Sequence, residues 1–327
     1  MNRRDSVLAL LALAAAPLAV NAQQLGKIPV IGFLHPGFPS GKVVNISEVG
    51  LREGLRELGH VEGQTIKIEW RWGLGKPSAL AGLAAELVRL KVDVVMAVGP
   101  PSVFAAKQAT TTLPIIAIDL ETDPIAAGLI ASFAKPGGNI TGLFLDLPGL
   151  TNKWLQLIRD IRPDTKRLAI LWHAPTGPYQ LRPIVAAAKS VSIETQVLEF
   201  RDGSELAAAL NSSLKGRPQA LIQLGSPLIN NSGKQIADFS AANRLPSISA
   251  FRSFPDNGGL MSYGPNLSIL YRRMGHYIAK IIKGEKPGDL PVELPTHFEL
   301  ILNAKAAKEM GLTVPQSLLL RSDEVIQ

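Results

Sequence analysis

The chain contains no cysteine among its 327 residues. This absence excludes disulfide scaffolds, thiolate zinc sites, iron–sulfur clusters, cysteine nucleophiles and lipid anchors attached through cysteine. Aromatic residues make up only 6% of the sequence, and the Lys and Arg residues behind the net charge of +7 are spread along the chain. Nucleic-acid-binding proteins instead gather basic residues on one face. We therefore expect no nucleic-acid partner.

Several catalytic and nucleotide-binding motifs are also missing. The sequence has no His-Glu-x-x-His zinc motif, no Gly-x-Ser-x-Gly serine motif and no Gly-x-x-x-x-Gly-Lys-Ser/Thr phosphate loop. The first expected strand ends in His35-Pro36-Gly37 in place of a dinucleotide-binding Gly-x-Gly-x-x-Gly. We therefore predict a protein without catalytic residues, metal or cofactor. A secreted hydrolase, which would need a nucleophile and a base in one pocket, remains an alternative.

Residues 1–22 have the three parts of a secretory signal. Arg3 and Arg4 form a charged head, residues 6–20 are almost entirely apolar, and the segment ends in Val20-Asn21-Ala22. The apolar stretch is shorter than the roughly 20 residues that span a bilayer. We predict cleavage near Ala22 and export to the periplasm, with the general and twin-arginine routes both open.

From residue 28 onward, short apolar strands alternate with amphipathic helices. The first group of expected strands covers residues 28–33, 65–72, 92–98 and 115–118, and the helices cover 46–58, 78–90, 99–110 and 124–134. A second group begins near residue 150, with strands at 167–172, 195–200, 220–224 and 247–250 and helices at 150–162, 179–191, 204–214 and 229–242. Such alternation predicts parallel sheets covered by helices, here an α/β protein of two Rossmann-like lobes.

Beyond residues 259–263, the last part of the chain adds a helix at 267–283, a Pro-rich stretch at 284–295, a strand at 297–302 and a helix at 304–310. These elements are too few for a third domain. We assign them mainly to the first lobe. Lobe one then comprises residues 28–145 plus 259–327, and lobe two comprises 146–258. The chain crosses between the lobes near 145 and 258, with a possible third crossing near 285.

Small ligands bind outside the carboxyl ends of parallel strands, so the loops after each strand are the candidate sites. The loop around Gly99, Pro101 and Ser102 opens a helix and suits a carboxylate or phosphate, although it could equally be an ordinary helix start. Asp119 and Asp123 could present a carboxylate to an ammonium group. The alternative for Asp123 is that it caps its own helix.

We expect ligand contacts from both lobes. An aromatic ligand would stack on Trp172 or Phe251. Such a ring pair adds roughly 0.5–1.5 kcal/mol to the binding free energy beyond the contribution of the buried area. The full set of candidate ligand-binding residues is His35, Gly37, Gly99, Pro101, Ser102 and Asp123 from lobe one, Trp172, His173, Ala174, Gly225, Ser226 and Phe251 from lobe two, and Tyr263 near a hinge crossing.

Three long segments, residues 98–110, 123–142 and 302–326, resemble the ABC transporter substrate-binding proteins related to tryptophan and tyrosine uptake. The resemblance covers nearly the whole chain after the signal. It implies a type I periplasmic binding protein, a monomer whose two hinged lobes close on a small ligand and deliver it to a membrane permease. The implied ligand is an amino acid, with aromatic amino acids foremost, whose carboxylate lies at Ser102 and whose ammonium group lies near Asp123.

The sequence departs from the family pattern at residues 171–175, where Leu-Trp-His-Ala-Pro replaces the usual Leu-x-Asn-Pro. This departure leaves the ligand's identity open. A ligand sensor that docks on a membrane receptor would have the same lobes and is a second alternative. A transcriptional regulator with these lobes would need a helix-turn-helix before the first strand, where the processed chain has only a few residues.

Overall fold

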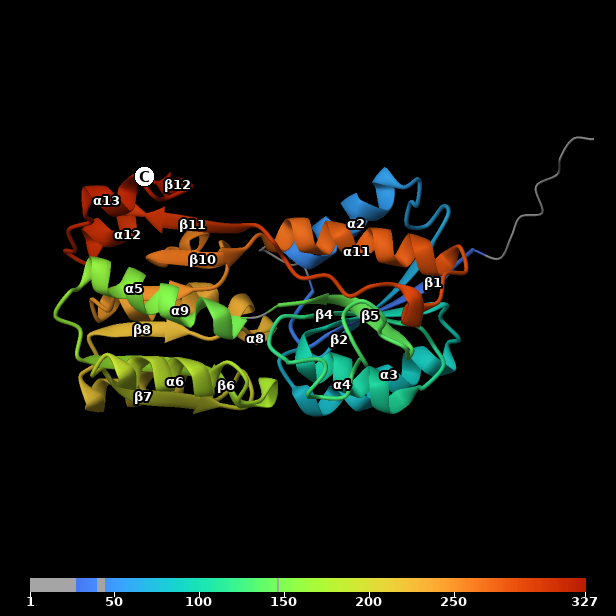
Figure 1. Cartoon of the computed structure of the whole chain (residues 1–327), viewed down its shortest axis with the longest axis horizontal. Helices are drawn as coiled ribbons and strands as arrows, with labels where there is room; N and C mark the ends of the chain where they lie inside the picture. Colours follow the sequence, from blue (N-terminus) through green and yellow to red (C-terminus); the bar gives the residue numbers. More distant parts are fainter. Residues whose placement is uncertain (1–27, 40–44, 146) are drawn as a thin grey trace, which may run out of the picture.

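The computed structural model describes residues 28–39, 45–145 and 147–327. These residues form two lobes side by side, each built around one β-sheet (Figure 1). The predicted signal peptide, residues 1–22, lies outside the described residues. No helix within the described ranges has the length and apolar character that crossing a bilayer requires.

Lobe one contains a five-stranded parallel sheet in the order β2-β1-β3-β4-β5. Its strands are β1 (Val30–His35), β2 (Lys67–Trp72), β3 (Val94–Val98), β4 (Ile115–Asp119) and β5 (Ile140–Phe144). Every residue of the last three strands is buried, as expected for parallel strands covered on both faces. One face packs against α3 (Leu80–Arg89) and α4 (Gly99–Ala109), and the other against α2 (Ile46–Glu57) and α11 (Leu267–Ile282).

Lobe two contains a seven-stranded sheet in the order β12-β11-β10-β9-β8-β6-β7, in which only the β10–β11 pair is antiparallel. Its strands are β6 (Arg167–His173), β7 (Glu194–Phe200), β8 (Ala220–Gln223), β9 (Ser247–Ser249), β10 (Met261–Pro265), β11 (Phe298–Asn303) and β12 (Glu324–Ile326). The helices α5 (Thr151–Ile161), α6 (Leu181–Ser190), α12 (Ala304–Glu309) and α13 (Gln316–Leu319) contribute to the core on one face. The other face packs against α7 (Leu206–Ser212), α8 (Pro227–Asn231), α9 (Gly233–Ala242) and α10 (Ser253–Asp256).

The described residues also contain short 3₁₀ helices, namely η2 (Pro77–Ala79), η3 (Leu147–Leu150), η4 (Ala174–Thr176), η5 (Ser213–Gly216) and η6 (Pro287–Asp289). The expected helix at residues 124–134 is absent, and this segment forms turns instead. Gly128 has a φ of +63° there, a backbone conformation that an α-helix does not contain. The expected helix at 229–242 is divided at Ser232 into α8 and α9. Strands β5, β10 and β12 were not among the expected elements.

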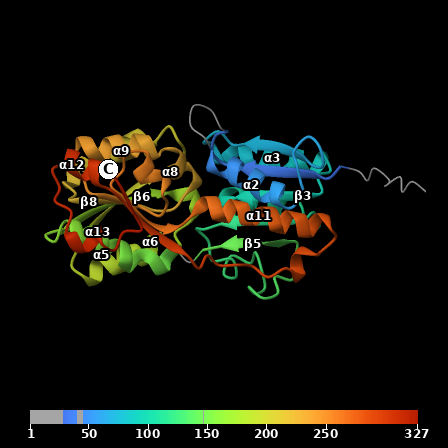
Figure 2. The ribbon, with the colours of Figure 1, turned by 90° about the horizontal axis from the view of Figure 1, so that it is seen from above.

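The last third of the chain belongs to both lobes, which differs from the expected division. Strands β10, β11 and β12 hydrogen-bond into the sheet of lobe two. Between β10 and β11 the chain returns to lobe one, where α11 packs beside α2 (Figure 2) and Glu293 pairs with Leu143 of β5. The assignment of residues 259–327 mainly to lobe one is therefore wrong for the three strands. Hydrophobic alternation predicts a strand but cannot tell which sheet edge it joins.

Three segments therefore connect the lobes: one after β5, one between β10 and α11, and one between Glu293 and β11. The second and third crossings lie beyond the expected positions of 258 and 285. Parallel connections of this kind allow two lobes to rotate about a common hinge. The helix α11 is held to lobe one by close contact of glycines, because a Cβ on Gly275 would lie 2.6 Å from the carbonyl carbon of Gly54.

Candidate functional site

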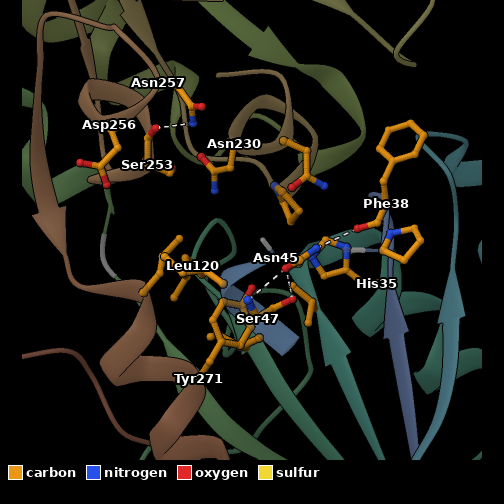
Figure 3. A pocket seen from close by; sticks show the side chains of 18 of the residues that line it. His35, Phe38, Asn45, Ser47, Leu120, Asn230, Ser253, Asp256, Asn257 and Tyr271 are labelled. Carbon is orange, nitrogen blue, oxygen red and sulfur yellow. Dashed lines mark hydrogen bonds between the residues drawn. The ribbon is translucent and has the colours of Figure 1, made fainter. Parts of the chain in front are cut away.

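A cavity of about 510 Å³ lies between the two lobes. On the lobe-one side it is lined at the carboxyl ends of β1, β3 and β4 and at the starts of α2 and α11, and on the lobe-two side by α8, α9 and α10. Figure 3 shows Asn230, Ser253 and Asn257 on one side and His35 and Tyr271 on the other. The carboxyl edge of a parallel sheet is the place where small ligands bind.

The two walls of this cavity differ in chemistry. Lobe one contributes many apolar side chains, namely Phe38, Ile46, Val98, Ile118, Leu120 and Leu267. Lobe two contributes mainly amide, hydroxyl and charged groups, namely Asn230, Asn231, Lys234, Ser253, Asp256 and Asn257, together with Pro227. A largely apolar pocket with a few polar groups is typical of sites for small organic molecules.

Two buried carboxyl groups lie at the carboxyl end of β4. Asp119 ends the strand with 0% exposure, and Glu121, which lines the cavity, is 2% exposed. The Glu121 backbone N–H donates to Asp119 Oδ1 at 3.1 Å, and the Leu120 N–H donates to Glu121 Oε2 at 3.2 Å. In the described part of the chain, no Lys, Arg or His side chain forms an ion pair with either carboxyl group.

Burial changes the protonation of this acidic pair. Removal from water raises the pKa of Asp119 to about 7. Burial, reinforced by the negative charge of Asp119, raises the pKa of Glu121 well above its usual range. Sequence reasoning named Asp119 but missed Glu121. The rule that ligands bind after parallel strands could have found Glu121, since it lies two residues beyond β4.

His35 lines the same cavity and is 3% exposed. Its Nδ1 accepts a hydrogen bond of 2.9 Å from the Gly37 N–H, and its ring packs on Phe33 and Trp72. Burial lowers the pKa of His35 to about 3, so the imidazole is neutral near pH 7. His35 therefore presents a neutral polar group to the cavity and no positive charge.

Gly37 and Gly99 lie where the lobes touch. A Cβ on Gly37 would come within 1.8 Å of Asn231 Nδ2, and a Cβ on Gly99 within 2.8 Å of Pro227 Cγ. Gly99 also has a φ of +71°, which side-chain-bearing residues rarely adopt. These glycines permit the close approach of lobe one to lobe two. Of the two, Gly99 lines the cavity directly.

The other lobe-one candidates lie away from the cavity lining. Ser102 is fully buried in α4, and the first turn of that helix contains Pro100 and Pro101, which have no N–H to offer an anion. Asp123 Oδ1 accepts hydrogen bonds of 3.0 Å from the N–H groups of Ile125 and Ala126. The geometry thus favours the capping alternative for Asp123 and weakens the expected anion site at residues 99–102.

In lobe two, Trp172 and Ala174 line a different space, an outer groove of about 970 Å³ between the lobes. Phe38 borders both this groove and the first cavity. The Trp172 indole N–H donates to the Gly177 carbonyl at 3.0 Å, which fixes the ring beside the groove. The departure from the family pattern at residues 171–175 therefore lies at the outer groove and not at the first cavity.

His173 and Ser226 form a buried pair behind these walls. Ser226 Oγ and His173 Nδ1 are 2.9 Å apart, and the two residues are 0% and 1% exposed. Burial lowers the pKa of His173 to about 4. Ser226 Oγ also accepts from the Leu228 N–H at the start of α8. Neither residue lines the cavity or the groove, so the pair serves to hold the strand ends of lobe two together.

Three further candidates, Gly225, Phe251 and Tyr263, lie outside the lining of both the cavity and the groove. Gly225 exchanges two hydrogen bonds with the Gln180 side chain, at 2.7 Å and 3.0 Å. Phe251 is 1% exposed and packs in the core, so it offers no stacking surface to a ligand. Tyr263 lies in β10 next to a lobe crossing, and its carbonyl accepts from the Trp154 indole N–H at 2.8 Å. None of the three lines either space.

Residues outside the sequence predictions make up most of the cavity. Asn230 and Asn231 of α8, Asn257 after α10 and Tyr271 of α11 all line it. Their positions depend on how the lobes meet, so no local pattern could have indicated them. Within residues 28–39, 45–145 and 147–327, no cluster of His, Asp and Glu side chains could hold a metal ion.

The model of the ABC transporter substrate binding protein family matches residues 38–326. The chain belongs to this family. It is 27% identical over 282 residues to a tyrosine-binding protein of Clostridioides difficile, which covers 85% of this chain and 78% of that relative. The resemblance seen in the sequence is confirmed.

Two solved structures share the fold. A conserved domain protein of Vibrio cholerae matches with a TM-score of 0.83 at 22% identity, over 91% of this chain and 100% of that one. An ABC domain from Streptococcus pneumonia in complex with L-Trp matches with a TM-score of 0.81 at 25% identity, over 91% of this chain and 99% of that one. The expected type I periplasmic binding protein fold is confirmed.

Proposed function

We propose that this chain is an exported solute-binding protein of an ABC importer. It captures an amino acid, with aromatic amino acids foremost, between its two lobes and delivers it to a membrane permease from the periplasm. The observation that carries the proposal is the cavity of about 510 Å³ lined by residues of both lobes. A volume between roughly 300 and 1,000 Å³ is typical of small-molecule sites.

Binding in such a cavity is a shift between open and closed forms. A ligand that contacts both lobes favours the closed form only by the free energy of the contacts it gains there. Here lobe one supplies most of the apolar side chains together with polar groups such as Glu121 and His35, and lobe two supplies amides, so a molecule with an apolar side chain and polar ends gains contacts on both sides. The closed form then presents a joint surface of the two lobes to the permease.

The amino-acid assignment has two supports. Buried Glu121 offers a site for a positive group, and the amide groups of Asn230, Asn231 and Asn257 can donate to a carboxylate. In addition, the chain is similar to a tyrosine-binding protein and to a structure in complex with L-Trp. In this proposal His35 and Gly99 stay in the ligand site, and the roles first given to Ser102 and Asp123 pass to groups that line the cavity.

We propose that the ligand is bound without chemical change. The closest approach to a catalytic arrangement in the described residues is the His173–Ser226 pair, and both side chains are buried away from the cavity. A hydrolase needs its nucleophile within reach of the substrate. Incubation with amino-acid esters and amides should therefore give no turnover above the uncatalysed rate.

A ligand panel tests the proposal directly. Purified protein without its signal segment is mixed with the common amino acids, with sugars and with small carboxylates, and the unfolding temperature and binding heat are measured. A ligand at 100 times its Kd adds about 2.7 kcal/mol to stability. We expect aromatic amino acids to give the largest shifts. Stabilisation by a sugar, with no response to any amino acid, would overturn the assignment.

Delivery is tested separately from binding. The protein is added to liposomes that contain the candidate permease and its ATPase, and uptake of the labelled amino acid is followed with ATP inside. We expect uptake to depend on this chain. Binding without stimulated uptake, together with ligand-dependent capture by a membrane receptor, would favour the sensor alternative. Cell fractionation tests the expected periplasmic location.

A further inference from the structure

The carboxyl groups of Asp119 and Glu121 are adjacent, buried and uncompensated. They are 0% and 2% exposed, and in the described part of the chain backbone N–H groups donate to both carboxyl groups, while no cationic side chain pairs with either. Asp119 Oδ2 is buried without a hydrogen-bond partner. Glu121 lines the cavity, and an ideal Cβ on Gly99 would lie 3.9 Å from its Oε2. Uncompensated buried carboxylates are costly unless they are protonated or paired with a cation.

The other titratable groups that line the cavity do not supply that cation. His35 is neutral near pH 7, because burial lowers its pKa to about 3. Tyr271 of α11 is buried beside Glu121, and this environment raises the pKa of its hydroxyl, so it carries no charge either. On lobe two, Lys234 pairs with Asp238, and Asp256 pairs with Arg252 at 3.3 Å. The acidic pair is thus left for a positive group that comes from outside the chain.

We propose that Glu121 receives the protonated amino group of the ligand and that the Asp119–Glu121 pair releases a proton to solvent when this group binds. This inference rests on the proposed function, since it names the recognition chemistry of the same cavity. In the empty protein at mildly acidic pH, both carboxyl groups hold their protons. On binding, the Glu121 O–H bond breaks, the proton passes to buffer, and the carboxylate pairs with the ligand's ammonium group. Asp119 keeps its proton.

The sign of the pH dependence follows from this proton release. At a pH where the empty pair holds two protons, binding must displace one, so affinity rises as pH increases. At a pH where the pair already holds only one, binding displaces none, and affinity no longer changes until the ligand amine itself loses its proton. The pair titrates as a unit, so the release belongs to both residues and not to one alone.

Isothermal titration calorimetry measures the release. The probe is the amino acid that binds best in the panel above, titrated between pH 5 and 8 in pairs of buffers with different ionisation enthalpies. We expect up to one proton released per ligand at the acidic end, declining as pH rises. The deaminated analogue of the same amino acid should bind at least roughly 30-fold more weakly, because it leaves the buried carboxyl without its cation.

Three variants locate the effect. Glu121→Gln keeps the shape but cannot ionise, so we expect affinity to fall roughly 30-fold or more and proton release to vanish. Asp119→Asn leaves Glu121 as the only group of the pair that can ionise, so proton release should persist and come from Glu121 alone. The matched control is Asp160→Asn, a lobe-two carboxyl that is paired with Arg321 and lies outside the cavity lining, and here both affinity and proton release should stay unchanged.

The outcomes separate the two proposals. If no amino acid binds, the proposed function fails and this inference falls with it. If an amino acid binds without proton release at any pH and Glu121→Gln retains wild-type affinity, the inference alone is overturned and the proposed function stands. Circular dichroism and thermal melts of each variant show whether a lost affinity reflects a lost fold.

Discussion

Gly99 of lobe one lies directly against Pro227 of lobe two, at the edge of the cavity. A Cβ at position 99 would be only 2.8 Å from Pro227 Cγ. Both residues line the cavity, so this contact and the ligand occupy the same boundary between the lobes. The contact also links the start of α4 to the start of α8, the helices that follow β3 and β8.

Replacing Gly99 by alanine should weaken ligand binding without removing any group that touches the ligand. The added methyl collides with Pro227 when the lobes close, and overpacking of this kind costs roughly 1–3 kcal/mol. We therefore expect Kd to increase about 5- to 150-fold. Titration calorimetry gives the affinity, and small-angle X-ray scattering with ligand shows whether closure is incomplete.

Gly128→Ala is the matched control for this variant. Gly128 also has a positive φ, +63°, but its nearest neighbour for an added Cβ is Lys107 Nζ at 4.0 Å. Both substitutions place a side chain on a residue with positive φ, but only Gly99→Ala also disturbs a contact between the lobes. A similar loss of affinity in both variants would show that strain, and not the Gly99–Pro227 contact, controls binding.

The contact between α2 and α11 should be important for stability. A Cβ on Gly275 would lie 2.6 Å from the Gly54 carbonyl carbon, so Gly275→Ala forces the helices apart. We expect a loss of roughly 1–3 kcal/mol in the free energy of unfolding, measured by urea denaturation. In α3, an added Cβ on Gly82 would meet nothing within 4 Å, so Gly82→Ala should instead stabilise by about 1 kcal/mol. Equal effects at both positions would contradict the close packing.

Asp119 should destabilise the folded protein as pH rises. Its pKa is raised from 3.8 to about 7 by burial, so the folded protein binds more protons than the unfolded chain between these values. The stability that protonated Asp119 contributes is full below pH 3.8 and is lost as pH increases towards 7. Asp119→Asn removes this loss, so the variant should be more stable than the wild type at pH 7. The measurement is urea denaturation of both proteins at pH 4 and pH 7, and a pH-independent difference would refute the idea.

His35 should make the folded protein less stable as pH falls, the opposite of the effect of Asp119. Its folded pKa of about 3 lies below the ordinary value of 6.5, so the folded protein binds fewer protons than the unfolded chain between these values. The stability that neutral His35 contributes is present above pH 6.5 and is lost as pH falls towards 3. We expect His35→Gln to lose less stability than the wild type between pH 7 and pH 4 in thermal melts. An identical decline in both proteins would mean that His35 does not titrate in this way.

The order of strands and helices in the first part of each lobe was predictable from local patterns. Apolar runs such as the one containing Val94 and Val98 are buried on both faces, and this makes parallel strands easy to recognise. The segment after Asp123 misled the same reasoning, because its apolar spacing resembles a helix while Gly128 turns the backbone out of the helical conformation. The spacing of apolar residues predicts which residues are buried, but it predicts backbone geometry only indirectly.

The candidate site was predictable only where it follows a strand. His35 and Gly99 come directly at strand ends, and both line the cavity. Phe251 and Ser102 have suitable chemistry and position in the sequence, yet both are buried away from it. Whether a loop residue faces a ligand or the core depends on the direction of its side chain, and the sequence pattern does not contain that direction.

The sequence by itself determined the family, the α/β class and the presence of two lobes, because these follow from long motifs and from the repeated burial of short apolar segments. Only the tertiary structure decided that β10, β11 and β12 join lobe two while α11 packs on lobe one. Only the tertiary structure, too, placed Glu121 across the cavity from the asparagines of lobe two. The reason is physical: strand pairing and the meeting of two surfaces depend on contacts between residues far apart in the chain, which no local pattern specifies.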